Sequence, residues 1–365
     1  MFYRLSTDGT RVDAALEGTF GGPGRTSCWL IGGGVTLNAG VAAQIVGTPV
    51  PRMCINLAGT GLFRPNLWTS YDPSARFHRS VYLDPGIMKF VHRRRAMDLV
   101  PETTFKVCDC PQVYFFDRDG ERGFANFLSA DQRGIVDWAD SMVQGIDLLF
   151  HLGIRRIFLA GCEMRVRPTE MQIAIAREKG IEYAENELLS EFLKRCRKAG
   201  VTEESLDATG ETDVYHFAER KPIRAAANTD FHYFRVSQYL RLSRRAMALA
   251  GVDLISVTPG SRLNDYFPFQ TVESVCAEML LEVGDPAHED VEGRYRLTGP
   301  RVMDGLGPMR DFKPHRWGEE KTKPVPAKRE MIVERKEGRG AKGLQRLREE
   351  LEIIDGNELV VNEEG

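Results

Sequence analysis

Three consecutive glycines, Gly32, Gly33 and Gly34, end a short apolar run and are followed by Thr36. Glycine lets a backbone turn sharply and lets another group approach closely. Where such a turn joins a strand to a helix, free N–H groups and the helix dipole converge, and both favour a bound phosphate. The motif therefore predicts a phosphate-binding turn, with the Thr36 hydroxyl beside it, or a plain connection between a strand and a helix.

Four more polar residues follow segments that read as strands: Asn56, Asp72, Glu163 and Ser261. In open α/β sheets, ligands bind beyond the carboxyl ends of the strands, where the loops converge. Each residue also has a structural interpretation. Asn56 and Ser261 could cap a turn or a short helix, Asp72 could begin an Asp-Pro turn, and Glu163 could be solvated. Because all four end strands of one expected sheet, we predict that they border a common crevice with the glycine turn.

A general base is the third kind of chemistry that the sequence suggests, and His232 is its candidate. It lies in Asn-Thr-Asp-Phe-His-Tyr-Phe, two residues after Asp230. A histidine titrates near neutral pH, so it could take a proton from an acceptor hydroxyl while a carboxylate orients it. The alternative is a structural histidine in an aromatic cluster just before a helix. His78 and His92, which lie among arginines, are candidates for contact with an acceptor or an anionic group.

The elements that must position these residues follow from apolar runs, helical periodicity and turn signals. Strands are expected at 28–31, 52–57, 67–73, 80–83, 104–108, 155–160 and 253–257, and helices at 39–46, 141–152, 170–179, 184–199 and 234–250. The helix at 141–152 is followed by Gly153 and a buried strand, which is half of a βαβ unit and requires a parallel sheet. We expect an α/β protein with a Rossmann-like, mostly parallel sheet and helices on both faces.

Changes in composition along the chain predict its domain organisation. Residues 1–25 are expected to form a lead-in with one short helix, residues 26–270 the nucleotide-binding domain, and residues 271–307 a peripheral segment. Residues 308–365, rich in Lys, Glu, Arg and Pro, are expected to be a charged, partly disordered tail. Its amphipathic patch, Leu344–Ile354, predicts a short docking helix or a segment that contacts a protein partner.

The composition is that of an ordinary soluble protein: 365 residues, 42% hydrophobic and 28% charged, with a formal net charge of −3. No apolar run approaches the roughly 18 residues of a membrane span, and Met1–Thr10 lacks the pattern of a secretory signal. The charge balance gives no general signal for nucleic acid, although Arg93–Arg95 is locally basic.

Seven cysteines, an odd number, predict reduced thiols in the cytoplasm. Cys108 and Cys110 are expected to be packing residues, and no metal site is predicted.

The order of the motifs resembles that of a known superfamily. An apolar strand runs into Gly-Gly-Gly-Val-Thr-Leu, a strand bearing Asn56 follows, and Asp72-Pro73 ends the next strand. Later come a helix headed by Ser141, a strand into Gly-Cys-Glu, and Thr-Pro-Gly-Ser after the last strand. This order is similar to that of the bacterial sialyltransferase-type glycosyltransferases and the related family of unknown function 115, which includes archaeal hydroxymethylpterin pyrophosphokinase-like proteins. The resemblance covers about residues 28–268 and is most specific at Gly145–Met164.

The resemblance implies a Rossmann-like fold that binds a nucleotide or nucleotide-sugar over the strand ends. Sialyltransferases of this type are metal-independent and hold a cytidine monophosphate sugar. Carried over by position, Gly32, Gly34 and Thr36 are implied to contact phosphate or ribose. Asn56 and Ser141 are implied to contact the nucleotide.

The same resemblance implies a catalytic role for His232, because these sialyltransferases use a histidine as general base on the acceptor hydroxyl. The chain departs from the family at the glycine turn itself. Gly-Gly-Gly-Val-Thr-Leu stands where the family usually has Gly-Asn-Gly-Pro-Ser-Leu, so the asparagine amide and the proline are missing. Thr36 keeps a hydroxyl at the serine position.

We therefore expect a transferase that uses an activated nucleotide donor, and specifically a glycosyltransferase in which His232 deprotonates an acceptor hydroxyl. No tightly bound cofactor is expected, because the nucleotide-sugar is a substrate. The alternative enzyme is a Mg²⁺-dependent pyrophosphokinase that uses a nucleoside triphosphate, with Asp72 and Glu163 as candidate metal ligands. The third possibility is a non-catalytic nucleotide-binding protein whose tail contacts a partner.

Overall fold

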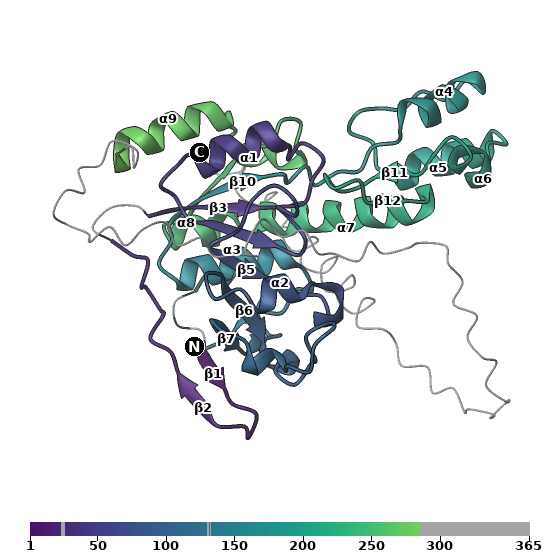
Figure 1. Ribbon diagram of the computed structural model, residues 1–365. Coiled ribbons are helices and arrows are strands. Elements are labelled where there is room, and N and C mark those ends of the chain that lie inside the picture. Colours follow the sequence, from purple (N-terminus) through teal and green to yellow (C-terminus); the bar gives the residue numbers. More distant parts are fainter. Residues whose placement is uncertain (23–25, 130, 132, 285–365) are drawn as a thin grey trace, which may run out of the picture. The chain divides into compact units, whose positions relative to one another are not determined.

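A nine-stranded, mostly parallel sheet forms the centre of the described part of the chain. The computed structural model describes residues 1–22, 26–129, 131 and 133–284. The strands of this sheet are β1 Tyr3–Leu5, β2 Arg11–Asp13, β3 Ser27–Ile31, β4 Arg52–Ile55, β5 Leu67–Thr69, β6 Met88–His92, β7 Val113–Phe116, β10 Arg156–Ala160 and β13 Asp253–Ser256. They lie in the order β13-β10-β3-β4-β5-β6-β7-β1-β2, with only β1 and β2 antiparallel to their neighbours (Figure 1). The expected α/β class with a mostly parallel sheet is confirmed.

The path of the chain through the sheet reverses between β3 and β10. From β3 the chain adds β4, β5, β6 and β7 in one direction, and it then returns to place β10 and β13 on the other side of β3. The loops that follow β3 and β10 therefore leave the carboxyl edge of the sheet in opposite directions, which opens a crevice between them. These loops begin with Gly32–Gly34 and with Gly161–Met164.

Successive residues of the central strands are buried on opposite faces of the sheet. In β3, Cys28 and Leu30 join one core, and Trp29 and Ile31 join the other. A strand with both faces covered reads as a continuous apolar run, which is why β3 and β10 can be read from the sequence. The first core includes residues of the helices α3 Ser141–His151, α7 Ile223–Leu242 and α8 Arg244–Leu249, and the second includes residues of α1 Ala39–Val46, α2 Arg79–Tyr82 and α9 Val272–Val283.

Residues 1–22, the described part of the expected lead-in, contain two strands and not the predicted short helix. β1 pairs with β2 over Tyr3–Leu5, and Tyr3 also pairs with Phe115 at the edge of the parallel sheet. Phe2 and Tyr3 are buried, and they fix this edge. Strands of three residues are too short to show the two-residue alternation by which a strand is recognised.

The strands predicted at 80–83 and 104–108 are also wrong. The first segment lies in helix α2, and the second leads into the 3₁₀ helix η3 Val107–Asp109. The true strands of this region are β6 and β7. Lys89 lies within β6, is fully buried and donates from Nζ to the Asp84 carbonyl at 2.6 Å. A charged residue is rarely this deeply buried, and it interrupts the apolar run that would reveal the strand.

A separate helical lobe is inserted between β10 and α7. It consists of α4 Glu170–Glu178, α5 Leu189–Lys198, α6 Glu203–Asp207 and the antiparallel pair β11 Thr212–Asp213 and β12 Arg220–Lys221. Its own core contains Phe192, Leu206 and Val214. Figure 1 shows these elements to one side of the sheet, with α7 running from them toward it. The helix predicted at 234–250 is two helices, α7 and α8, and α7 begins at Ile223 inside the expected polar insert.

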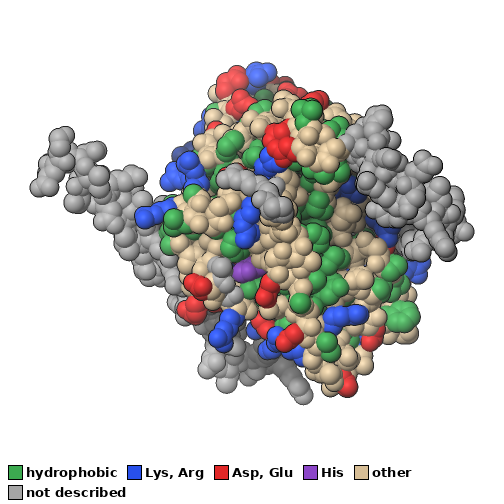
Figure 2. Space-filling model, turned by 90° about the vertical axis from the view of Figure 1, so that its left-hand side faces the viewer, with side chains coloured by type: hydrophobic (Ala, Val, Ile, Leu, Met, Phe, Trp, Pro, Cys, Tyr) green, Lys and Arg blue, Asp and Glu red, His purple; other side chains and the backbone are tan. Residues whose placement is uncertain are grey.

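A second, two-stranded parallel sheet lies beside α3. A short parallel pair, β8 Arg118–Asp119 and β9 Ile135–Val136, contacts α3. No helix in the ranges given above is long and apolar enough to cross a membrane. All seven cysteines are free, and Cys276 is the one that is not fully buried. On the face drawn in Figure 2, acidic and basic side chains lie interspersed. Leu344–Ile354 and the rest of the charged tail lie outside the described residues.

Asp230 joins the helical lobe to the sheet. Its Oδ1 accepts hydrogen bonds from the Val166 N–H at 3.0 Å and from Nη2 of Arg262 at 3.2 Å, and its Oδ2 accepts the Leu189 N–H at 3.0 Å. Nη1 of Arg262 donates to the Met164 carbonyl at 2.7 Å. Both side chains are buried, with 1% and 6% exposed. One carboxylate thus connects the loop after β10, the start of α5 and the segment after β13.

We predict that Asp230→Ala destabilises the protein by about 3–5 kcal/mol, because it leaves the Arg262 guanidinium buried without its partner. The free energy of unfolding in urea is the measurement. Asp213→Ala is the control: it removes an ion pair with Arg220 whose side chains are 50% and 57% exposed, and such pairs contribute at most about 1 kcal/mol. Equal unfolding midpoints for Asp230→Ala and the wild type would contradict this account of the junction.

Candidate functional site

Two adjoining cavities lie at the carboxyl edge of the sheet, where the loops after β3 and β10 separate. The smaller, about 60 Å³, is lined by Gly32–Gly34, Asn56, Asp140, Ser141, Glu163, Tyr215 and Tyr233, among others. The larger, about 520 Å³, is lined by Val35, Thr36, Glu163, Arg165, Arg167, Val214 and Tyr233, among others. Glu163 and Tyr233 border both cavities. Ligand sites are commonly about 300–1,000 Å³ in volume, so the larger cavity has room for a small molecule.

The sequence-predicted residues divide into those that border this crevice and those that do not. Gly32, Gly33, Gly34, Thr36, Asn56, Ser141 and Glu163 line one or both cavities. Asp72 lies outside the lining and forms an ion pair with Arg76 at 2.5 Å. Ser261 is buried: its Oγ donates to the Cys162 carbonyl at 2.6 Å and accepts the Leu263 N–H at 3.2 Å, which caps η4 Arg262–Asp265.

The three glycines of the turn pack closely against other parts of the chain. A Cβ on Gly32 would lie 2.4 Å from the Gly161 carbonyl oxygen, and one on Gly33 would lie 2.1 Å from the Tyr215 ring. A Cβ on Gly34 would lie 1.3 Å from Oε2 of Glu163. The turn therefore leaves space that two other side chains of the crevice occupy.

Glu163 is bound to the end of the glycine turn. Its Oε1 accepts the Thr36 N–H at 2.7 Å and also the Thr36 hydroxyl. The Gly34 N–H donates to the Gly161 carbonyl at 2.8 Å, and the Gly33 carbonyl accepts the His216 N–H at 3.1 Å. The loops after β3 and β10 are thus held together by polar contacts at the base of the crevice.

Asn56 is held in one orientation by two hydroxyls. Its Oδ1 accepts from Oγ of Ser70 at 2.6 Å and from Oγ of Ser141 at 2.8 Å. Those hydroxyl oxygens in turn accept the N–H groups of Asp72 and Tyr71, at 3.0 and 2.9 Å. With its oxygen fixed in this way, Asn56 has no partner for Nδ2 among residues 1–22, 26–129, 131 and 133–284. The amide N–H₂ is the group that Asn56 can offer to the cavity it lines.

His232 reaches the crevice through Asp140. It lies within α7, and its Nε2 is 3.0 Å from Oδ2 of Asp140, which lines the smaller cavity. The other oxygen of Asp140 accepts the N–H groups of Met142 and Val143 and caps α3. The carboxylate that contacts His232 is thus Asp140. Asp230, which precedes His232 in the sequence, binds Val166, Leu189 and Arg262 instead, because residues two apart on a helix point in different directions. His232 itself is not among the residues that line either cavity.

Tyr215, Tyr233, Asp140, Arg165 and Arg167 also border the crevice, and the sequence analysis missed all five. Tyr233 is hydrogen-bonded to Tyr215, and burial raises the pKa of Tyr215 to about 12. Burial also raises the pKa of Tyr233 well above its ordinary value, with Tyr215 and Glu163 nearby. Asp140 had a signal in the sequence, since Asp is a common N-cap and it directly precedes the expected helix. Tyr215 lies in the polar insert, where no pattern marked it.

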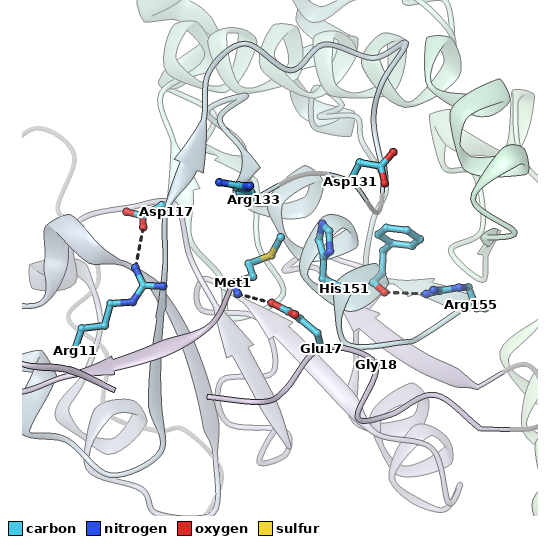
Figure 3. Close-up of a pocket in the computed structure, with 10 residues that line it drawn as sticks. Met1, Arg11, Glu17, Gly18, Asp117, Asp131, Arg133, His151 and Arg155 are labelled. Atoms are coloured by element: carbon cyan, nitrogen blue, oxygen red, sulfur yellow. Dashed lines mark hydrogen bonds and ion pairs between the residues drawn. The ribbon is translucent and has the colours of Figure 1, made fainter. Parts of the chain in front are cut away.

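A further cavity, about 630 Å³, is lined by residues that precede β1 and β10, by the end of α3 and by Asp117, which follows β7 (Figure 3). Several of its polar groups are bound within the chain. Arg11 pairs with Asp117 at 3.9 Å, the Met1 amine pairs with Glu17, and Nη1 of Arg155 donates to the Phe150 carbonyl at 2.8 Å. None of the sequence-predicted site residues lines it. We therefore take the crevice at the carboxyl edge as the candidate site.

His92, a second histidine singled out in the sequence, ends β6 beside two arginines. Burial, reinforced by Arg118 and Arg94, lowers the pKa of His92 to about 4. The unfolded chain then binds a proton near the ordinary histidine pKa of about 6.5, before the folded protein does. His92 therefore contributes stability above about pH 6.5 that is lost as the pH falls toward 4.

We predict that His92→Gln reduces the loss of stability between about pH 6.5 and 4, because glutamine does not titrate in this range. Urea unfolding of both proteins at a series of pH values is the measurement. At each pH, the difference in unfolding free energy between the two proteins gives the contribution of His92 alone. Other titrating groups, including His216, whose pKa is also lowered by burial, are common to both proteins. Parallel pH profiles would show that His92 does not carry this dependence.

Comparisons with protein-family models, curated proteins and solved structures give no match to this chain. The resemblance of its motifs to the sialyltransferase-type superfamily therefore stays a prediction.

Proposed function

We propose that the crevice between β3 and β10 binds a nucleotide or nucleotide-sugar, and that the protein is a Rossmann-like transferase acting on an acceptor hydroxyl. One observation carries the proposal. The strand order reverses between β3 and β10, and the glycine turn, Asn56, Ser141 and Glu163 all border the cavities at that point. Ligands of open α/β sheets bind at such reversals.

The larger cavity has the size and lining that a nucleotide-sugar needs. Val35, Val166 and Val214 give it apolar walls. Its charged lining consists of Arg165 and Arg167 together with Glu163, Glu185 and Asp213, and Arg167 pairs with Glu185 at 2.9 Å. Apolar walls suit the base, and guanidinium groups bind phosphate through paired hydrogen bonds. The N–H₂ of Asn56 provides a neutral donor at the deeper end of the crevice.

The proposed chemistry is a direct displacement at the anomeric carbon of the donor. His232 donates its Nε2–H to Asp140, which leaves Nδ1 free to accept a proton. In the reaction, the acceptor oxygen bonds to the anomeric carbon as its proton passes to His232. The bond from that carbon to the phosphate oxygen breaks, and the nucleotide leaves with the electron pair near Arg165 and Arg167. The carboxylate of Asp140 stabilises the imidazolium that forms.

A pyrophosphokinase requires Mg²⁺ bridging the phosphates of a triphosphate. Its candidate ligands, Asp72 and Glu163, are bound to different groups, Arg76 and Thr36. The two carboxylates therefore do not form a ready Mg²⁺ site, and the transferase is the preferred activity. The pyrophosphokinase and a non-catalytic nucleotide-binding role are alternative outcomes of the binding test below.

We predict that Asn56→Asp weakens nucleotide binding by about tenfold or more while the fold is kept. The new carboxylate still accepts from Ser70 and Ser141 but places a negatively charged oxygen where the ligand meets an N–H₂ donor. Calorimetric titration with nucleoside monophosphates and nucleotide-sugars, without metal, is the measurement. Asn66→Asp is the matched control, since Oδ1 of Asn66 accepts the Arg52 N–H at 3.0 Å on the opposite edge of the sheet.

The same titrations separate the three activities. Binding of monophosphates or nucleotide-sugars without metal supports the transferase. Stabilisation only by triphosphates with Mg²⁺ would favour the pyrophosphokinase instead. If no nucleotide binds to the wild type, both enzyme proposals fail.

We predict that His232→Ala lowers kcat by about a hundredfold or more and changes donor affinity little, because a general base acts in the chemical step. The test requires a donor and an acceptor found by screening, with the released nucleotide as readout. Phe231→Ala is the control, since Phe231 is the neighbouring residue of α7 and its side chain is 40% exposed. An unchanged rate in His232→Ala would remove His232 from the mechanism.

A further inference from the structure

The N–H groups of Gly32, Gly34 and Thr36, which the sequence assigns to a ligand phosphate, are already bound to protein acceptors. The Thr36 N–H and hydroxyl both donate to Oε1 of Glu163, and the Gly34 N–H donates to Gly161. The space over Gly34, which a phosphate would need, contains the Glu163 carboxylate. A negatively charged group of the chain itself therefore occupies the turn.

We infer that Glu163, rather than a ligand phosphate, is the anion bound at the glycine turn, and that its second oxygen accepts hydrogen bonds from hydroxyls of the ligand's ribose or sugar ring. The second half of this inference rests on the proposed function. The first half rests on the contacts of Glu163 alone.

The chemistry of a carboxylate sets what Glu163 can recognise. An ionised carboxylate only accepts hydrogen bonds, so it binds hydroxyl or N–H groups and repels phosphate oxygens. Its Oε1 is used by Thr36, and Glu163 borders both cavities. A sugar ring with two neighbouring hydroxyls offers the donors that Oε2 can accept.

The position of the arginines then orients the ligand. Arg165 and Arg167 line the larger cavity together with Glu163, and they are two and four residues further along the same loop. Arg167 also pairs with Glu185 at 2.9 Å, and Arg165 donates to the Glu185 carbonyl and to Asn186, so a ligand phosphate shares these arginines with acceptors of the chain. A carboxylate followed by two arginines on one loop favours a ligand that is hydroxylated at one end and anionic at the other. The ring therefore lies against Glu163 and the phosphate against the arginines, which reverses the orientation expected from the glycine motif.

The first test uses inorganic phosphate as the probe and thermal unfolding as the readout, at matched ionic strength in sodium chloride. Glu163→Ala frees the Thr36 donors and removes the competing charge, so phosphate should raise its melting temperature by more than it raises that of the wild type, in which only the arginines of the cavity can bind it. Glu178→Ala, at an exposed position of α4, is the control and should behave as the wild type. Phosphate stabilisation of the wild type that Thr36→Val abolishes would overturn the inference. So would a Glu163→Ala protein that phosphate stabilises no more than the wild type.

The second test compares ribonucleotides with their 2′-deoxy and 3′-deoxy counterparts by calorimetry. A hydrogen bond to a charged group corresponds to about tenfold to a hundredfold in affinity, so the wild type should prefer the ribose forms by that factor. Glu163→Ala should lose the preference. Glu163→Gln keeps the volume and an oxygen for Thr36, so it provides a folded variant with a weakened preference even if the alanine protein does not fold.

The two tests distinguish failure of the inference from failure of the proposed function. If ribonucleotides bind and the wild type does not distinguish them from deoxy forms, the hydroxyl contact is wrong and the nucleotide site stands. If no nucleotide binds at all, the proposed function and the hydroxyl contact both fail. The phosphate titration still decides whether Glu163 is the anion of the turn.

Discussion

The buried ion pair between Asp230 and Arg262 is the interaction on which the crevice depends. Three parts of the chain meet there: the loop after β10, the start of α5 and the segment after β13. Two charges removed from water are tolerated only when further hydrogen bonds satisfy them. Val166, Leu189 and Met164 provide those bonds, so the pair also fixes the loop that bears Glu163. The wall of the crevice is therefore set by a contact that no ligand touches.

Buried charges also explain where the sequence predicts the fold and where it does not. Strands β3, β10 and β13 are nearly continuous apolar runs and can be read directly. Strand β6 is interrupted by the buried Lys89, and the first half of α7 is interrupted by the buried Asp230. Ile223, Ala226 and Ala227 of α7 have helical spacing, but with Asp230 as the next buried position the apolar pattern ends early. Strand β6 and the first half of α7 were missed because their charged residues find hydrogen-bond partners inside the protein, which a pattern of polarity cannot show.

The candidate site could be predicted in part, because parallel strands bring their carboxyl ends to one edge. This rule alone is enough to place Gly32–Gly34, Asn56 and Glu163 together. The rule does not predict which side chains occupy the space beside the glycine turn. A glycine turn has the same sequence whether a ligand or the Tyr215 ring and the Glu163 carboxylate lie against it. Contacts from the helical lobe, such as that of Tyr215, come from residues far away in the sequence and carry no local signal.

Helix α7 has a consequence for how a ligand enters. Its first turns pack in the core of the lobe, through Ile223 and Ala226. Its last turns pack in the first core of the sheet, the one shared with α3 and α8, through Val236 and Leu240. A continuous helix of 20 residues, about 30 Å long, therefore connects the core of the lobe to a core of the sheet. Hinge closure of the lobe would require this helix to break. A ligand therefore enters the larger cavity with the lobe in place, and the His216 N–H that donates to the Gly33 carbonyl is a further contact between the lobe and the glycine turn.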